Sequence, residues 1–92
     1  MDNEKRSFKN IPKSSNHVLF GQKIKDIRKS KAMTQADLAR LIVINDEEGT
    51  TMDLAVLSKI ERGISNITLE KLFSLAKALK VKPSELFDFY IE

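Results

Sequence analysis

The sequence contains two short fragments, residues 34–39 and 57–63, that each predict a capped amphipathic helix. In the first fragment, Thr34 stands where the hydroxyl of a helix-capping residue is expected. Leu38 and Ala39 then begin an apolar stripe along one face of that helix. The helix is too short to be stable by itself and must pack, and the small Ala39 suits a close crossing with a second helix.

The second fragment ends in Gly63, which can adopt the left-handed conformation of a helix C-cap. Leu57, Ile60 and Ile64 recur at intervals of three and four residues and form its apolar face. Lys59 lies on the opposite side. The pattern therefore predicts a helix with a buried face and a basic outer face.

With a third block, residues 66–79 (NITLEKLFSLAKAL), these fragments resemble the phage-repressor-type (XRE-like) helix-turn-helix family. The family pattern is T-Q-x-x-L-A, then S-x-I-E-x-G, then N-x-T-L-x-x-L-x-x-L-A-x-x-L, and all three blocks occur in order within residues 18–88. The resemblance implies an all-α fold, a five-helix lambda-repressor-like DNA-binding domain. It also implies that the helix over residues 53–62 reads DNA in the major groove.

Length and composition predict one small domain, residues 17–92, preceded by a disordered basic tail, residues 1–16. The first helix is expected to begin near Val18, after a cap at Ser15 or Asn16. Helices are also expected after Thr34, over about residues 53–62, over about 69–80 with Thr68 as the cap, and from Pro83. No segment alternates with a period of two, so no strand is predicted.

Positive charge gathers in the N-terminal third. Residues 1–33 contain nine Lys or Arg against three acids, a balance of +6, so residues 34–92 balance at −3. This asymmetry suits a protein that meets a polyanion such as double-stranded DNA. For the tail, the alternative is that its lysines only keep the chain soluble.

Several function classes find no support in the sequence. The only histidine is His17, which excludes a histidine-ligated metal cluster and a Ser/His/Asp triad. The acids at 46–48 lack calcium-loop spacing, and no glycine-rich phosphate loop is present. We therefore expect no enzyme activity, no cofactor and no metal. The absence of cysteine and of a long apolar run predicts a cytoplasmic protein without a membrane partner.

The sequence departs from the family pattern between the two central helices, where the usual tight turn is longer by roughly eight residues, 45–52. Val43 replaces the glycine that normally stops the first of these helices, so this helix can run on toward Asn45. Gly49 then provides the turn. We expect the acidic residues 46–48 to lie on an exposed flexible loop that points away from DNA, because three carboxylates facing the groove would repel phosphate.

The long turn leaves the start of the reading helix open, with Thr50, Thr51 and Asp53 as competing caps. By resemblance, the positions after the cap reach the bases. With Asp53 as the cap these are Leu54 and Ala55, of which Leu54 can touch a thymine methyl. A start one turn earlier brings Thr51 and Asp53 toward the DNA instead. The alternative for Leu54, as for Met52, is a packing role.

Other DNA contacts follow from the resemblance. Lys59, with Ser58 beside it, is the best-placed basic residue of the reading helix in either register. Thr34 and Gln35, at the start of the preceding helix, match the main phosphate clamp of the family. The secondary phosphate contacts are Arg62, Ser65 and Asn66, whose alternative role is ordinary loop and cap duty.

Two further sets of residues have structural roles by resemblance. Arg28 and Glu61 match positions that form a partly buried ion pair between the first helix and the reading helix. The C-terminus leaves an apolar cluster that a monomer would expose to water, and we expect it to form a homodimer interface. Its residues are Phe87, Phe89, Tyr90 and Ile91.

The sequence thus predicts a sequence-specific DNA-binding transcriptional regulator, a repressor or autoregulator that binds a palindromic operator as a dimer. Two alternatives remain open. One is an antitoxin that mainly holds a protein partner. The other is an oligomerisation module that has lost base reading, an alternative that the apolar Leu54 and Ala55 suggest.

Overall fold

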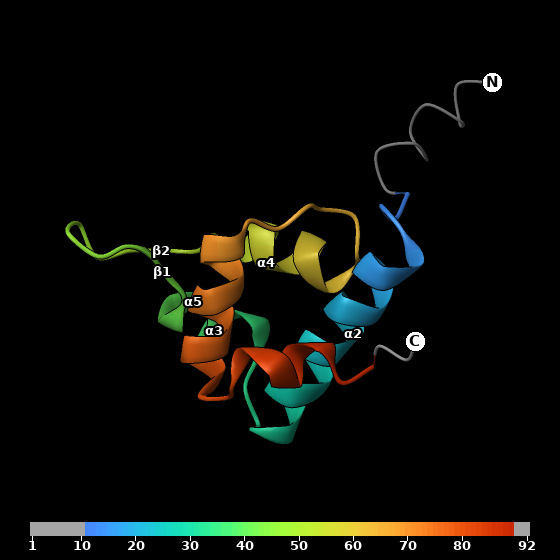
Figure 1. Ribbon diagram of the computed structural model, residues 1–92. Coiled ribbons are helices and arrows are strands. Elements are labelled where there is room, and N and C mark those ends of the chain that lie inside the picture. Colours follow the sequence, from blue (N-terminus) through green and yellow to red (C-terminus); the bar gives the residue numbers. More distant parts are fainter. Residues whose placement is uncertain (1–10, 90–92) are drawn as a thin grey trace.

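The computed structural model describes residues 11–89 of the chain. Within them the fold contains four α-helices, one two-stranded sheet and one short 3-10 helix (Figure 1). The elements, in chain order, are α2 (Ser15–Ser30), α3 (Gln35–Leu41), β1 (Val43–Asn45), β2 (Thr50–Thr51), α4 (Leu54–Glu61), α5 (Leu69–Leu79) and η1 (Pro83–Phe87). Most of the proposed basic tail, and the proposed interface residues Tyr90 and Ile91, lie outside the described residues.

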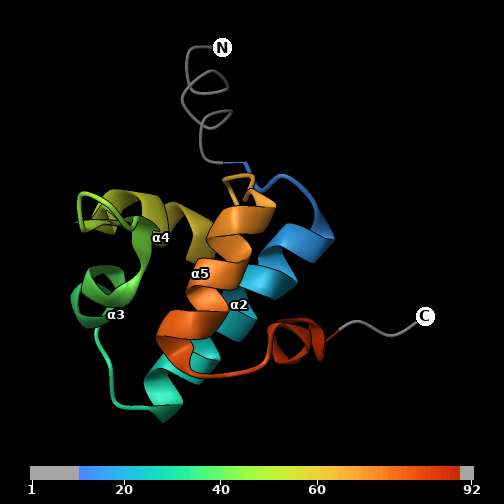
Figure 2. The same ribbon diagram turned by 60° about the vertical axis from the view of Figure 1, so that its left-hand side comes forward.

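The core forms where α2, α3, α4 and α5 meet, and η1 covers it by packing on α2 and α5 (Figures 1 and 2). Each helix contributes apolar side chains at helical spacing, as the sequence pattern predicts. The largest fully buried side chains come from all of these elements and are Ile24, Leu38, Ile42, Leu57, Leu75, Leu79 and Leu86. None of the helices in residues 11–89 has the length and apolar character needed to cross a membrane.

Polar caps set the helix boundaries. The Thr34 hydroxyl accepts a hydrogen bond from the Asp37 backbone N–H at 3.0 Å, and the Thr68 hydroxyl accepts one from that of Lys71 at 3.2 Å. These interactions confirm both predicted caps. α2 begins at Ser15, three residues before the expected start, because Ser14 is its cap and accepts from the backbone N–H of His17.

The inserted segment forms a hairpin, which corrects the prediction of an all-helical chain with a simple loop. α3 ends at Leu41 and does not run on toward Asn45. Val43 pairs with Thr51, and Asn45 with Thr50, in an antiparallel register with an irregularity between them. The sequence pattern missed these strands because they are too short to alternate, although their β-branched residues favour extended backbone.

The hairpin turn lies at residues 46–49, and all four residues are exposed, as expected of the acidic segment. The Asn45 side-chain oxygen accepts a hydrogen bond from the Glu48 backbone N–H at 3.2 Å, and Gly49 has a φ of +68°. At the base of the hairpin, the Met52 N–H donates to the carbonyl of the buried Ile42 at 2.9 Å. The hairpin therefore projects from the helical body but begins and ends in the core (Figure 1).

The C-terminal element is also shorter than predicted. The segment that begins at Pro83 is a 3-10 helix of five residues, so the described residues do not contain the fifth α-helix that the sequence predicted. The Lys82 backbone N–H donates to Glu85 Oε2 at 2.7 Å, and the Glu85 backbone N–H donates to the Lys82 carbonyl at 2.9 Å. Pro83 supplies its first position, as expected, and Leu86 still reaches the core.

α2 and α4 pack closely against each other at Gly21. A Cβ at this position would stand 2.4 Å from the carbonyl oxygens of both Ile60 and Glu61. Backbone atoms cannot move aside as a flexible side chain can. The glycine therefore permits the close packing of α2 on α4.

We expect Gly21→Ala to destabilise the fold by at least about 2 kcal/mol, because it overpacks this contact. In an open helix the same change would instead stabilise by about 1 kcal/mol. Urea unfolding measures the difference. The matched control is Gly49→Ala, where nothing lies within 4 Å and only the left-handed backbone, φ +68°, opposes the change. That control should cost about 1 kcal/mol, and equal losses at both positions would contradict the packing argument.

Candidate DNA-binding interface

The outer face of α4 is exposed along its whole length. Leu57 and Ile60 are buried, whereas Ala55, Lys59 and Arg62, spaced by three and four residues, are exposed on the opposite side. Ser58 is half-buried beside Lys59. The helix therefore presents a row of small and basic side chains to solvent.

The structure resolves where this helix begins. Asp53 is its N-cap residue, and Leu54 is the first helical residue, although the Asp53 side chain makes no capping hydrogen bond. Thr51 belongs to β2 and is half-buried, so it lies before the helix. Leu54 is 49% exposed, while Met52 is only 4% exposed. The sequence offered packing as an alternative role for both residues. Met52 packs in the core, whereas Leu54 remains accessible.

Beneath α4, a buried polar network joins three helices. Arg28 Nε donates to Glu61 Oε2 at 2.7 Å, and Arg28 Nη2 donates to Glu61 Oε1 at 3.0 Å. Both residues are buried, at 6% and 7% exposure. Hydrogen bonding to Glu61 raises the pKa of the Arg28 guanidinium above its ordinary value, despite the opposing effect of burial. The contact is bidentate, because two N–H groups of the guanidinium donate to the two oxygens of one carboxylate.

Two further groups complete this network. Arg28 Nη1 donates to the carbonyl oxygen of Met33 at 2.8 Å, which fixes the turn between α2 and α3. Gln35 Nε2, at the start of α3, donates to Glu61 Oε1 at 2.9 Å. The residue expected to hold a phosphate thus already has a partner within the protein. One N–H of its amide group remains in addition to the one that Glu61 receives.

The first turn of α3 also contains an acidic side chain, Asp37, that the motif comparison did not single out. Asp37 Oδ2 accepts from the Thr34 backbone N–H at 3.0 Å, which completes a reciprocal capping box. Hydrogen bonds from the backbone and side chain of Thr34 lower the pKa of Asp37. Arg40 Nη2 lies 2.8 Å from Asp37 Oδ1 and balances its charge. The T-x-x-D spacing in the sequence was the available signal for this box.

The loop after α4 is held by the start of α2. His17 Nε2 lies 3.0 Å from Asn66 Oδ1, and the Lys13 backbone N–H donates to the Gly63 carbonyl at 2.8 Å. Asn66 is thus tied to His17, a partner that no sequence pattern indicated because the two are 49 residues apart. Ser65 donates to the Asn66 carbonyl at 3.0 Å. The position of this loop is therefore set by α2.

Aromatic side chains gather at the end of the described chain. The ring centroids of Phe20 and Phe87 are 5.5 Å apart, and those of Phe87 and Phe89 are 6.3 Å apart. With Asn16, these three rings line a shallow groove between α2 and η1. Phe87 is 42% exposed. Across residues 11–89, His, Cys, Asp and Glu side chains nowhere form a group of three or more that could hold a metal ion.

The comparisons with known proteins agree with this geometry. The chain belongs to the helix-turn-helix family, whose model matches residues 24–86. This membership confirms the phage-repressor-type resemblance and makes the protein a DNA-binding transcriptional regulator and not an enzyme.

Two similar proteins within this family are control proteins. Control protein C.BamHI of Bacillus amyloliquefaciens is 38% identical over 73 residues, which cover 78% of this chain and 80% of that protein. The crystal structure of the restriction-modification controller protein C.AhdI from Aeromonas hydrophila matches with a TM-score of 0.70 and 32% identity. That match covers 80% of this chain and the whole of C.AhdI.

We expect Glu61→Ala to destabilise the protein by about 3 to 5 kcal/mol, because it leaves the buried Arg28 charge without its partner. Replacing both residues, as in Arg28→Met with Glu61→Leu, should cost clearly less, since no buried charge remains. Urea unfolding of the wild type, of Arg28→Met and Glu61→Leu alone, and of the double variant gives the coupling. Additive losses would show that the two side chains stabilise the fold independently.

Proposed function

We propose that the protein is a controller-type repressor or autoregulator that binds a palindromic operator as a homodimer. The observation that carries this proposal is the exposed outer face of α4, held rigidly on α2 and α3 by the Arg28–Glu61–Gln35 network. The named relatives are control proteins, which supports the same regulatory role. The cytoplasm, where DNA and regulator meet, is the proposed location.

For base reading, we assign the first turn and the middle of α4. Leu54 and Ala55 offer only apolar contact, which suits the methyl group of thymine. Lys59, with Ser58 beside it, offers hydrogen bonds to the acceptors of guanine. Thr51 and Asp53 flank this row at the end of β2, where Asp53 can accept from the amino group of cytosine.

For phosphate binding, we assign the residues at the two ends of the motif. At the start of α3, the free backbone N–H groups, the Thr34 hydroxyl and the remaining amide N–H of Gln35 can receive one phosphate. Asp37 beside them opposes this binding, and its pairing with Arg40 reduces the repulsion. Arg62, Ser65 and Asn66 can contact a second phosphate from the loop that α2 holds in place.

For the dimer, we assign the aromatic surface around Phe87 and Phe89. Tyr90 and Ile91, which the sequence assigns to the same interface, lie outside the described residues. The groove against Phe20 and Asn16 can receive the same residues of a second copy. A two-fold interface of this kind would present two α4 helices to successive major grooves, about 34 Å apart.

The DNA-binding proposal predicts that two substitutions on α4 behave differently. Against an operator selected from random DNA, Lys59→Ala should weaken binding by at least about tenfold more than it weakens binding to non-specific DNA. Arg62→Ala should weaken both equally and lower the salt dependence by about one counterion. Titrations at several salt concentrations measure these effects. The control is Lys82→Ala, an exposed lysine outside the basic N-terminal third, which should change neither affinity. Equal losses for Lys59→Ala on both DNAs would make it a phosphate contact.

The dimer proposal predicts that Phe89→Ser weakens self-association by at least about tenfold, because it removes a large apolar side chain from the interface. Sedimentation at low micromolar concentration provides the measurement. Leu69→Ser is the matched control, since Leu69 is 68% exposed but lies at the start of α5, away from the aromatic groove. A wild type that stays monomeric would refute the dimer.

A further inference from the structure

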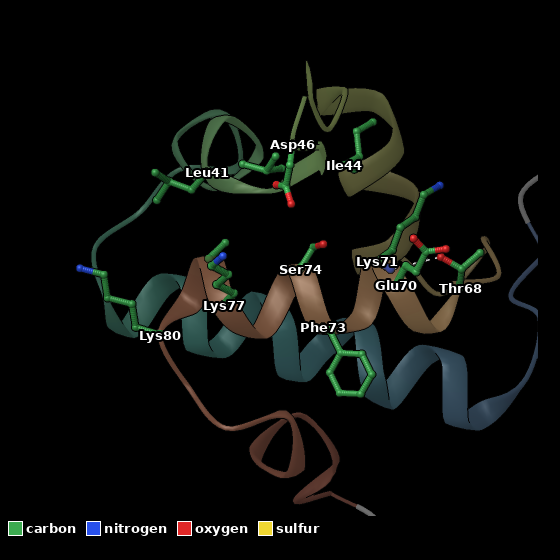
Figure 3. Close-up of a pocket in the computed structure, with 12 residues that line it drawn as sticks. Leu41, Ile44, Asp46, Thr68, Glu70, Lys71, Phe73, Ser74, Lys77 and Lys80 are labelled. Carbon is green, nitrogen blue, oxygen red and sulfur yellow. Dashed lines mark hydrogen bonds between the residues drawn. The ribbon is translucent and has the colours of Figure 1, made fainter. Parts of the chain in front are cut away.

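The hairpin insertion creates a groove that the helix-turn-helix motif does not need. The groove has a volume of about 570 Å³ and lies between the end of α3, β1 and α5 (Figure 3). Its apolar lining comes from Leu41, Val43 and Ile44 on one side and from Ala78 of α5 on the other, whereas the ring of Phe73 points away from the hairpin (Figure 3). The groove is separate from the outer face of α4 and from the aromatic surface, because it contains no residue of either.

Three apolar side chains on the hairpin side of this groove are exposed. Leu41 is 52%, Val43 38% and Ile44 47% exposed. A single exposed apolar residue is ordinary on a protein surface, but several that gather in one groove mark a binding surface. Something apolar is therefore expected to cover them.

The two rims of the groove have opposite charge. On the hairpin side, Asp46 faces the groove, and the turn continues with Glu47 and Glu48 (Figure 3). On the α5 side, the rim consists of Lys71, Lys77 and Lys80, together with Glu70. Within residues 11–89, no ion pair joins the hairpin acids to these lysines. Both sets of charges are therefore available to a partner.

We propose that this groove binds the hairpin of a second copy of the chain. In a two-fold arrangement, the hairpin of each copy packs against the α5 wall of the other copy's groove. The exposed Ile44 of one copy then meets the apolar lining of the other. At the same time, the acidic turn of each copy meets the lysines on α5 of its partner. A surface with both charges on the same chain complements itself, which favours a second copy over an unrelated partner.

This contact is additional to the proposed aromatic dimer and involves different elements. If both interfaces form, the protein assembles beyond a dimer at high concentration. Because the hairpin contact depends on charge, high salt should weaken it. Substitutions that abolish the aromatic dimer or DNA binding would leave the hairpin contact unaffected. The hairpin contact can therefore be refuted without refuting the other two proposals, and the reverse also holds.

Charge reversal on opposite rims gives the decisive test. One variant carries Asp46→Lys and Glu47→Lys, and the other carries Lys71→Glu and Lys77→Glu. Glu48 is left unchanged because its carboxylate accepts from Asn45 and Thr50 within the turn. Each variant alone places like charges together and should associate at least about tenfold more weakly than the wild type. An equimolar mixture should recover the association, because each variant complements the other.

Sedimentation of the wild type, the two variants and their mixture gives the result, with circular dichroism to verify folding. Recovery in the mixture cannot arise from a folding defect in either variant. A mixture that sediments as its separate components would overturn the proposal, and so would a wild type that associates no further than both variants.

A second comparison tests the apolar part of the contact without changing charge. Ile44→Ser should weaken the association at least about threefold, because it removes an apolar side chain from the contact. Leu69→Ser, an exposed apolar residue outside the groove lining, should leave it unchanged. Equal effects of the two substitutions would show that the groove is not the contact surface.

Discussion

The carboxylate of Glu61 is the group on which the arrangement of the reading helix depends. It accepts hydrogen bonds from Arg28 on α2 and from Gln35 on α3, while its own backbone ends α4. A buried carboxylate must be paired, so the three helices can meet only in the arrangement that satisfies it. Gly21 permits the close packing of α2 on α4, and the network sets their orientation. The exposed face of α4 is therefore fixed by groups on its buried side.

This arrangement explains how the motif tolerates a long insertion. The hairpin leaves the core at Ile42 and returns at Met52, and the backbone hydrogen bond between these two buried residues closes its base. Since the ends of the inserted segment are close together, α3 and α4 can cross much as they would with a tight turn, and the loop closure costs little. The additional residues project outward, where they form one wall of the groove on α5.

Several groups of the proposed DNA surface also have structural partners. Gln35 is bonded to Glu61, Asn66 lies against His17, and the phosphate site at α3 lies beside the capping carboxylate of Asp37. Such contacts hold side chains and backbone in place before DNA arrives, which lowers the entropy cost of binding. They also explain why the same positions can be interpreted either as DNA contacts or as cap and loop residues.

The sequence by itself determined the caps at Thr34 and Thr68 and the glycine turn at Gly63, because these depend on neighbouring residues and on helical periodicity. It determined the helix-turn-helix class through the resemblance of its motifs to a known family. It also placed Arg28 and Glu61 together, but only through a resemblance. The tertiary structure decided the rest. Val43, Ile44, Thr50 and Thr51 become strands because the buried Ile42 and Met52 bring them together, and a pairing of two or three residues leaves no periodic signal. Likewise, the contact between His17 and Asn66 and the groove beside α5 arise from residues far apart in the chain, which only packing can bring together.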